Sequence, residues 1–535
     1  MIRKRFTVVF VGILLILFAG LSVASSLRES LTFDEIVHIQ EGKNALLAHT
    51  FVIDTNNPPL IRELAVVPLV LGVEKMIHSP YPNIQMLPAR LVIVILGIFL
   101  CVSVFWFAKK YVGREAALFA LLLFVFEPNT LAHSHYVTQD IGVTLFFFLT
   151  YMVFVRLLAK PTKTNFMVFG VLAGLMASSK ISVLPYFFVS ALTLSLLFLK
   201  KKCAPWFWQR RIPLSFAICI SLLVIWATYF FKSNVVIAPG GNSQRLSVRL
   251  TQTSGSQLVI NTIRFFQTQP IPLGDYIAVL KNTVIRSTQP QKTFFLGTFY
   301  ANVHSYFMVA TVVLKSSLPL LLLFIVGFWL GLSDKINRQS ILIFGVPVAA
   351  ILLVGSMSHM QPWNRYMLPL YPFVVVIAAS SLRHFNSTLA RILLILLCLW
   401  HVQGTLSYYP HFIAFKNEIV SRNTSYTKFM DANMDWGQSL PDLARYKDMV
   451  HPGHISFSYF GRDNGDAYGL VSNFAYGSHK YEDICAFHEI NYPGNSGASF
   501  TAISLSNWYY CGYNLDPKYS KSKLKTIVGD AILIY

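Results

Sequence analysis

Two adjacent carboxylates, Asp34 and Glu35, follow the first long apolar segment of the chain, and an imidazole, His38, lies one helical turn later. The apolar segment, roughly residues 6–25, is long enough to cross a membrane. Ionisable groups that a membrane protein keeps beside the bilayer often mark where chemistry or transport takes place. The cluster therefore predicts either a functional site or a solvated loop, and its companions decide between them.

Further polar side chains interrupt the later apolar runs. Asp140 directly precedes an apolar run, where it is either a helix N-cap or a site carboxylate. Lys180 ends another run, where it either reaches the interface from a span end or takes part in a site. His133 and His135 form an i, i+2 pair without further fixed ligands, which is weak support for a metal site.

Six charged residues are the candidates for chemistry. They are the carboxylates Asp34, Glu35 and Asp140 and the cations Arg62, Lys180 and Arg365. Cations beside a lipid phase would stabilise the negative charge on a phosphate leaving group, and a carboxylate would accept the proton of an attacking hydroxyl. This set suits a lipid-linked phosphate donor. No phosphate-binding glycine loop suggests a soluble nucleotide, and a divalent metal at the acidic residues stays open.

The amino-acid composition is that of a protein embedded in a membrane. The 535 residues are 54% hydrophobic and only 13% charged, with a mean hydropathy of +0.53. Apolar windows near or above the length of a spanning helix recur along the chain, so we expect a polytopic helical protein with about eleven spans. The windows lie near residues 7–26, 89–108, 115–131, 141–158, 165–179, 181–199, 213–231, 307–330, 340–356, 366–381 and 390–405.

Basic residues gather in every second short loop, which is the positive-inside pattern of a polytopic protein of the plasma (inner) membrane. It predicts a cytoplasmic N-terminus, with the Asp34 loop and everything after about residue 406 on the other side. Arg365 then carries a positive charge where such charges are scarce, which favours an anionic partner. Although the net charge is +20, no basic face with interleaved aromatic residues remains to indicate nucleic-acid binding.

We expect a membrane core over residues 1–405, with outer loops at 27–88 and 232–306, and an extracytoplasmic C-terminal domain over 406–535. In the first loop, residues 60–76 suit a helix lying in the interface. Turn signals between short β-prone runs predict a small α/β or α+β C-terminal domain. Its Cys485 and Cys511 form either one disulfide or two unpaired buried thiols, whereas the other four cysteines are expected to be free.

The order of these motifs resembles the protein O-mannosyltransferase and lipid A aminoarabinose transferase superfamily, and the C-terminal portion is similar to its bacterial phospholipid-carrier-dependent glycosyltransferases. The motifs that carry the resemblance are Asp34-Glu35 with His38, Asn57-Pro58-Pro59-Leu60, Glu127-Pro128, His133-Ser134, Thr138-Gln139-Asp140, Ser179-Lys180, Arg365-Tyr366, Tyr409-Pro410-His411 and Asn433 to Gln438.

The resemblance implies the C-type glycosyltransferase (GT-C) fold and transfer of a sugar from a polyprenyl-phosphate carrier to an extracytoplasmic acceptor hydroxyl, usually with inversion. By position, Asp34 would be the catalytic base, with Glu35 assisting it. Asp140 would orient acceptor or sugar, and Arg365 is a candidate for binding the phosphate. His38 fits a loop-shaping role better than a reacting one.

Two departures from the family pattern matter: one concerns the binding of the carrier phosphate, and the other leaves the acceptor open between protein, lipid and glycan. Aminoarabinose transferases place a phosphate-binding lysine before the double proline, where this chain has Asn57. Arg62 or Lys180 are the candidates to replace that charge. The sugar-reading domains of eukaryotic protein mannosyltransferases find no room in this chain. Two other functions are kept as alternatives: a transporter or flippase of lipid-linked sugars, and a non-catalytic envelope-assembly protein.

Overall fold

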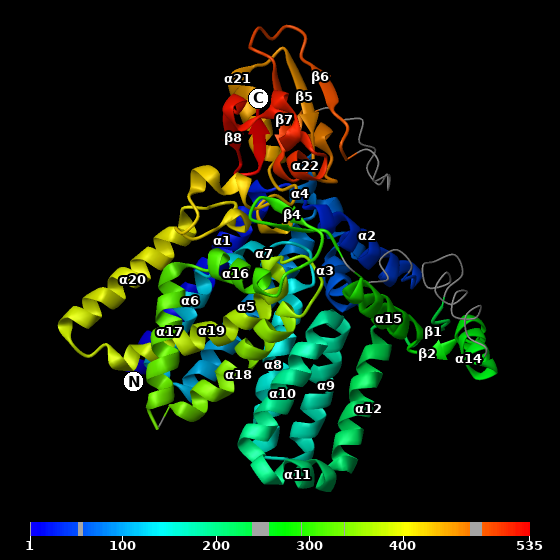
Figure 1. Cartoon of the computed structure of the whole chain (residues 1–535), viewed down its shortest axis with the longest axis vertical. Coiled ribbons are helices and arrows are strands. Elements are labelled where there is room, and N and C mark those ends of the chain that lie inside the picture. Colours follow the sequence, from blue (N-terminus) through cyan, green and yellow to red (C-terminus); the bar gives the residue numbers. More distant parts are fainter. Residues whose placement is uncertain (1, 52–56, 238–255, 290, 336, 471–483) are drawn as a thin grey trace. The chain divides into compact units, whose positions relative to one another are not determined.

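The computed structural model describes residues 2–51, 57–237, 256–289, 291–335, 337–470 and 484–535. Figure 1 shows the chain as a largely helical structure with strands near its C-terminal end. It forms two compact units. Unit 1 consists of Met1–Gln40, Ala65–Leu145 and Gln291–Tyr535, and unit 2 of Glu41–Leu64 and Phe146–Pro290. Parts of the predicted outer loops 27–88 and 232–306 lie outside the described residues.

Unit 1 contains most of the long apolar helices. Serine side chains cap two of them: Ser317 accepts from the Leu320 N–H at the start of α17, and Ser387 accepts from the Ala390 N–H at the start of α20. The helices of this part are α1 (Ile2–Arg28), α4 (Pro82–Gln85), α5 (Leu87–Tyr111), α6 (Arg114–Val125), α7 (Pro128–His133), α16 (Tyr306–Lys315), α17 (Leu318–Ser333), α18 (Arg338–Ser356), α19 (Tyr371–Ser380) and α20 (Thr388–Leu406).

All eleven predicted spans fall on helices, but their lengths differ. Among the described residues, seven helices are long and apolar enough to cross a membrane. The helices α16 and α17 are bent by 112° relative to each other, and counting this pair as one span gives eight. The other three windows coincide with α6, α9 and α12, which have 12, 17 and 17 residues. The window at 115–131 is interrupted because Glu127 caps a separate helix, α7. Which side each loop faces stays a prediction.

Unit 2 is held together by a close helix pair. Gly170 and Gly174 lie one turn apart on α9 (Lys163–Ser179), and a Cβ atom on Gly174 would come within 2.6 Å of the Val224 Cβ of α12 (Arg211–Ala227). Small residues at this spacing let two helices approach closely in a membrane. The other elements of this unit are α10 (Leu184–Leu199), α11 (Cys203–Gln209), α14 (Gln257–Thr268), α15 (Gly274–Thr288), β1 (Ser233–Asn234) and β2 (Ile271–Pro272).

Three helices have one end in each unit: α2 (Phe33–Ala48), α3 (Leu60–Val70) and α8 (Asp140–Ala159). The predicted interface helix at 60–76 is formed by α3 and the following 3₁₀ turn Val73–Met76. It is interrupted at Gly72, whose φ of +80° suits glycine. Its location in a membrane interface stays a prediction.

The C-terminal residues form a mixed five-stranded sheet in the order β6-β5-β7-β9-β8. Neighbouring strands are antiparallel except β5 and β7, which are parallel. The strands are β5 (His454–Ser458), β6 (His488–Asn491), β7 (Phe500–Ser504), β8 (Thr526–Val528) and β9 (Ile532–Ile534). A short hairpin, β3 (Thr293–Phe295) and β4 (Thr298–Tyr300), lies earlier in unit 1.

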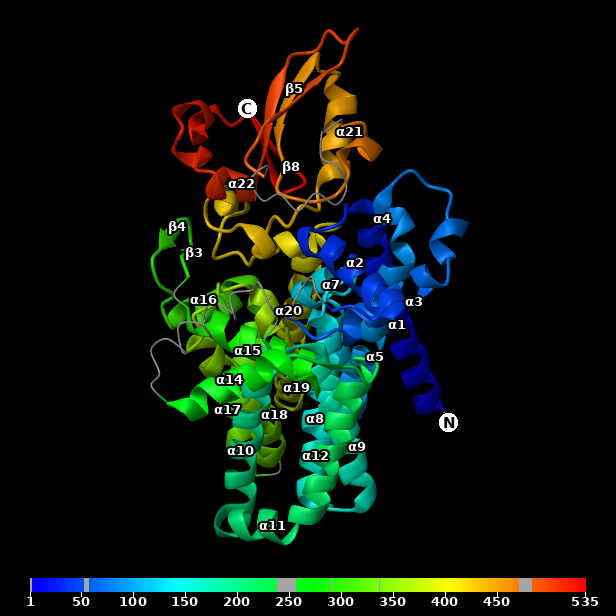
Figure 2. The ribbon, with the colours of Figure 1, turned by 90° about the vertical axis from the view of Figure 1, so that its right-hand side faces the viewer.

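Alternate residues of the sheet point to one face, as the period of a strand requires. Ile455, Phe457 and Ala502 on this face form a buried core with Leu440 and Leu443. The last two come from α21 (Leu440–Val450), which Figure 2 shows beside β5. The predicted small α/β or α+β architecture of the C-terminal residues is confirmed. Their sheet belongs to the same compact unit as α1, and the boundary near residue 406 stays a prediction.

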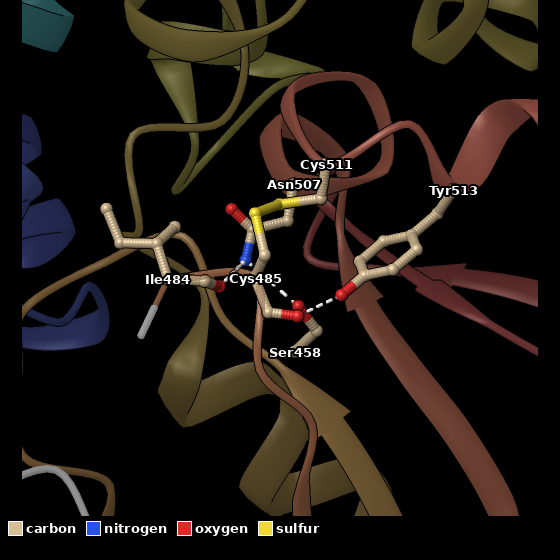
Figure 3. The surroundings of a disulfide bond; sticks show 6 residues. All are labelled: Ser458, Ile484, Cys485, Asn507, Cys511 and Tyr513. Carbon is tan, nitrogen blue, oxygen red and sulfur yellow. Dashed lines mark hydrogen bonds between the residues drawn. A yellow bond between two sulfur atoms is a disulfide. The ribbon is translucent and has the colours of Figure 1, made fainter. Parts of the chain in front are cut away.

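The two cysteines of the C-terminal residues are joined. Cys485 and Cys511 form a disulfide across 26 residues, at the C-terminal end of α22 (Leu505–Tyr510) (Figure 3). Asn507 supports it by donating hydrogen bonds to the Ser458 hydroxyl at 3.0 Å and to the Ile484 carbonyl at 2.7 Å. The alternative left open by the sequence, two unpaired thiols, does not hold in this structure. The other four cysteines are free.

Candidate active site

The predicted catalytic carboxylates begin α2, and the local sequence explains why. Thr32 precedes the helix, and the Glu35 carboxylate accepts from its N–H at 2.8 Å and its hydroxyl at 3.0 Å. The glutamate side of a capping box is present, in which a glutamate reaches back to the N–H of a threonine three residues earlier, whereas the Glu35 N–H donates to the Thr32 backbone carbonyl at 3.1 Å. Negative charges in the first turn are also favoured by the helix dipole. The box fixes the direction in which Asp34, between its two members, leaves the backbone.

Glu35 is completely buried and is held by Arg90, which extends from α5. The Arg90 Nε donates to Glu35 Oε1 at 2.9 Å and its Nη2 to Glu35 Oε2 at 2.7 Å. The other Arg90 donors reach the carbonyls of Ser26, Glu29 and Ser30 at 2.8–3.0 Å. With the Val137 N–H as a further donor to Glu35, this carboxylate is a buried anchor in the structure. Its predicted catalytic assistance stays a prediction.

Asp34 is the more open of the two carboxylates, with 30% of its side chain exposed. Its Oδ2 accepts from the Nη1 of Arg365 at 2.7 Å, from the 3₁₀ helix Asn364–Leu370. Burial alone would raise the pKa of Asp34, but the positive charges of Arg365 and His38 lower it below its usual value. Asp34 is therefore a carboxylate at neutral pH, ready to accept a proton.

Asp140 belongs to the same group of charges. It begins α8, is buried, and its Oδ2 accepts from the Thr138 hydroxyl at 3.2 Å. Its charge raises the pKa of Asp34, which places the two carboxylates within electrostatic range. His133 Nδ1 lies 3.7 Å from Asp140 Oδ2. The structure thus brings Asp34, Asp140 and Arg365 together, although Arg365 follows Asp34 by 331 positions in the chain.

The two histidines of the weak metal motif diverge. His133 faces Asp140, whereas the Nε2 of His135 lies 2.7 Å from Glu29 Oε2. Among the described residues, no group of three or more histidine, cysteine, aspartate or glutamate side chains is arranged to hold a metal ion. The two rings contact different residues because α7 ends at His133, so that His135 lies outside the helix.

The motif around Trp436 holds the guanidinium of Arg365. Trp436 is buried, and its ring centre lies 4.5 Å from the Arg365 Cζ, within the range of a cation–π contact. Asp435 fixes the turn, because its carboxylate accepts from the N–H groups of Ser506 at 2.7 Å and Gly437 at 3.2 Å. The C-terminal residues therefore take part in the candidate site. Sequence reasoning noticed the motif but not its contact with Arg365.

Backbone hydrogen bonds also join the Asp34 loop to the C-terminal residues. The N–H groups of Ser30 and Phe33 donate to the carbonyls of Gln438 and Trp436, both at 2.9 Å. The Leu31 N–H donates to Asp463 Oδ2 at 2.8 Å. The segment that leads to Asp34 therefore forms hydrogen bonds with Arg90 and, separately, with the C-terminal residues.

A buried chain of charges lies next to this loop. Glu29 accepts from His411 Nδ1 at 2.9 Å and from the Tyr136 hydroxyl at 2.8 Å, and His411 Nε2 lies 2.9 Å from Asp442 Oδ2. Burial would raise the pKa of Glu29, but the hydrogen bonds from His135 and His411 lower it to about 2. Burial would lower the pKa of His411, but Asp442 and Glu29 raise it to about 10.

These shifts predict the pH dependence of stability. The contribution of Glu29 is present above its unfolded pKa of 4.5 and is lost as the pH falls through about 2. That of His411 is complete below its unfolded pKa of 6.5 and is lost as the pH rises through about 10. His411→Gln is therefore expected to lower the free energy of unfolding by about 3 kcal/mol near pH 6, and by less at pH 9.

Thermal unfolding midpoints of the full-length protein between pH 4 and 10 measure this prediction. The matched control is His454→Gln, which removes a surface pair with Glu489 and is expected to cost less than about 1 kcal/mol. An equal loss at every pH in His411→Gln would contradict the assigned charge on His411.

The two remaining candidates, Arg62 and Lys180, belong to unit 2. Arg62 forms an ion pair with Glu41 and donates to the Asn57 carbonyl. Lys180 is buried and follows the last residue of α9. Their roles in binding a phosphate stay predictions. The residue of this network that the sequence did not single out is Arg90, a charge inside an apolar span.

Comparisons with known proteins found one family model and several solved structures of similar fold. Residues 83–229 match the family model described as dolichyl-phosphate-mannose-protein mannosyltransferase. The fold is similar to the crystal structure of ArnT from Cupriavidus metallidurans in the apo state, with a TM-score of 0.52 and 11% identity over 100% of this chain and 98% of that chain. For the same protein bound to undecaprenyl phosphate, the TM-score is 0.50 and the identity 12%, over 99% and 98%.

A third similar structure is the archaeal oligosaccharyltransferase AglB from Archaeoglobus fulgidus in complex with an inhibitory peptide and a dolichol-phosphate. Its TM-score is 0.45 with 13% identity, over 75% of this chain and 55% of that chain. No curated protein matches the chain by sequence. At these identities the likeness to the solved structures concerns the fold.

Proposed function

We propose that this chain is a member of the protein O-mannosyltransferase and aminoarabinose transferase superfamily of C-type glycosyltransferases, and that it transfers a sugar from a polyprenyl-phosphate carrier to an acceptor hydroxyl, with Asp34 as the general base. The match of residues 83–229 to the family model and the similarity of the fold to ArnT support this proposal. The predicted fold class, a polytopic helical membrane protein of the GT-C type, is confirmed. The observation that carries the proposal is the ion pair between Asp34 and Arg365, beside Asp140.

The ion pair supplies both charges that the reaction needs. The acceptor hydroxyl gives its proton to Asp34 while its oxygen attacks the anomeric carbon of the donor. The bond between that carbon and the phosphate oxygen breaks, and its electron pair leaves with the polyprenyl phosphate. Arg365 stabilises the charge that develops on this phosphate. Attack opposite to the leaving group inverts the anomeric configuration.

Arg365 is suited to exchange partners. Its Nη1 binds Asp34, whereas its Nε is buried and has no hydrogen-bond acceptor among the described residues. A guanidinium presents five donors in a fork that matches phosphate oxygens. A donor phosphate that accepts from Arg365 would replace Asp34 as its partner and free the carboxylate for the acceptor. Donor binding thereby prepares the base.

The test uses the purified full-length protein with undecaprenyl-phosphate-linked mannose and other undecaprenyl-phosphate hexoses as donors, and envelope lipids and glycans as acceptors. Acceptor-dependent release of undecaprenyl phosphate is the expected result. Movement of the intact donor across a liposome membrane without release would instead favour a transporter. Neither release nor movement would favour a non-catalytic envelope-assembly protein. We propose that the site faces the outside of the plasma membrane, with the N-terminus in the cytoplasm, as the distribution of basic loops indicates.

Arg365→Gln tests the pairing through the pH dependence of the reaction. Arg365 holds the pKa of Asp34 below its usual value, so its removal raises that pKa. The acid limb of kcat/KM, which reports the free enzyme, is expected to move to higher pH, with a loss of about 10²- to 10³-fold at its maximum. The control is Arg264→Gln on α14, where the side chain is exposed. An unmoved acid limb would contradict the pairing.

A further inference from the structure

We propose that Asp431 and Tyr510, both from the C-terminal residues, bind a sugar ring next to Asp34 and determine which sugar the protein uses. The inference rests on the proposed function and names the recognition residues of the same site. Nothing in the transfer step described above requires either residue, because Asp34 accepts the proton and Arg365 receives the phosphate.

The first observation is the position of the Asp431 carboxylate. The Asp431 N–H donates to the Ser506 hydroxyl at 2.9 Å, and its Oδ2 accepts from the Tyr510 hydroxyl at 2.7 Å. In the same turn, Asn433 Oδ1 accepts from the N–H of Asn364, the neighbour of Arg365, at 3.0 Å. The charges of Arg365 and Asp34 both act on Asp431. The carboxylate is therefore fixed within electrostatic range of the reacting pair.

The second observation is the backbone at this residue. Asp431 has a φ of +49°, in the left-handed region that few residues other than glycine occupy. Such conformations persist where surrounding contacts impose them, and they are common at functional sites. The Asp431 side chain is only partly buried, so it is open to a ligand. Desolvation raises its pKa to about 6, which leaves it a hydrogen-bond acceptor at neutral pH.

The third observation is a row of aromatic rings beside this carboxylate. The Tyr510 ring is 44% exposed and lies 5.7 Å from Phe460 and 6.3 Å from Phe299, between ring centres. Phe460 is buried and stacks on Phe33 at 5.0 Å, and Phe33 precedes Asp34. The exposed rings beside the Asp431 carboxylate are therefore Tyr510 and Phe299, which is 42% exposed, and Phe460 and Phe33 connect them to the residue before Asp34.

This combination fits a carbohydrate. The C–H face of a sugar ring is apolar and packs on aromatic faces. Its hydroxyls donate hydrogen bonds, for which a carboxylate is the stronger acceptor. A site built to bind a particular hydroxyl also rejects sugars that lack it, because its polar groups would be left unpaired. The ring is either that of the donor or that of a glycan acceptor, since both present the same chemistry.

The experiment compares Asp431→Asn and Tyr510→Phe with matched controls in the full-length protein. The controls are Asp448→Asn, which alters an exposed carboxylate, and Tyr446→Phe, whose ring packs on Phe500. With undecaprenyl-phosphate mannose as donor, kcat/KM for one substrate is expected to fall about 10- to 100-fold in Asp431→Asn. The rise in KM identifies the source: the donor if its KM rises, the acceptor if the acceptor KM rises. Binding of sugar-free undecaprenyl phosphate and the unfolding midpoint are expected to be unchanged.

Three results would overturn the inference while the wild-type protein is active. The first is unchanged kinetics of Asp431→Asn for both substrates. The second is a lower kcat with unchanged KM, accompanied by a lower unfolding midpoint. The third is weaker binding of sugar-free undecaprenyl phosphate. If the wild-type protein shows no transfer, the proposed function fails, and binding of a sugar is then tested by itself.

That test is saturation-transfer NMR with methyl mannoside and methyl galactoside. Saturation of the sugar ring protons by the wild type, and not by Asp431→Asn, would support the sugar site. Any other result would overturn it.

Discussion

Replacing Asp34 with asparagine is expected to lower the rate of sugar transfer by about 10²- to 10⁴-fold, the usual contribution of a positioned general base. Asparagine has nearly the same size and still accepts a hydrogen bond from Arg365, but it cannot take the proton of the acceptor hydroxyl. Initial rates of undecaprenyl phosphate release from the donor measure the effect.

Two further measurements separate this loss from misfolding. Asp448→Asn, which neutralises an exposed carboxylate in the C-terminal residues, is expected to retain the wild-type rate. Sugar-free undecaprenyl phosphate is expected to bind Asp34→Asn at least as tightly as the wild type, because the carboxylate that competes for Arg365 has lost its charge. Release at the wild-type rate in Asp34→Asn would remove Asp34 from the role of base.

Arg90→Met is expected to have the largest effect on stability. It leaves the Glu35 carboxylate fully buried without its cation, and removal of one partner of a buried ion pair typically costs about 3–5 kcal/mol. Methionine fills much of the same volume, so the loss reports the charge rather than a cavity. Unfolding midpoints of the full-length protein in detergent measure it. Lys109→Met, at the exposed far end of the same helix, is expected to change the free energy of unfolding by less than about 0.5 kcal/mol.

The double variant Arg90→Met, Glu35→Gln is expected to recover most of the stability, because neither charge is then left unpaired. Its activity also tests the role of Glu35. Transfer within about tenfold of the wild type in the folded double variant would make Glu35 a positioning residue, whereas a folded but inactive double variant would support a part in the chemistry. A fully stable Arg90→Met single variant would contradict the assigned network.

Features that depend on neighbouring residues in the chain, such as apolar helices and short strands, could be predicted from the sequence. Apolar runs gave the positions of the membrane helices, but α6 and α7 were joined into one window because the cap formed by Glu127 was not recognised. The sequence Thr32-Phe33-Asp34-Glu35 contains a capping box, which would have identified Glu35 as a helix-starting residue. The disulfide between Cys485 and Cys511 was one of two alternatives until the strands were placed.

Long-range contacts limited the prediction of the site. Asp34, Asp140 and Arg365 were brought together by their expected side of the membrane and by family resemblance, and the structure agrees for these three. Arg90 has its partner 55 residues away, and no pattern in the sequence indicates the pairing. The position of Asp431 could not be predicted either, because its neighbours depend on how the C-terminal turn packs against Asn364.

The hydrogen bonds between residues 30–33 and 436–438 have a consequence for how such proteins diversify. The two segments share backbone partners, so a C-terminal portion exchanged between relatives must bring an Asp34 loop that matches it in register. Under the proposed function, a change of sugar preference in the C-terminal chain is therefore constrained by the loop that carries Asp34. The two segments form one structural unit, although some 400 residues of chain separate them.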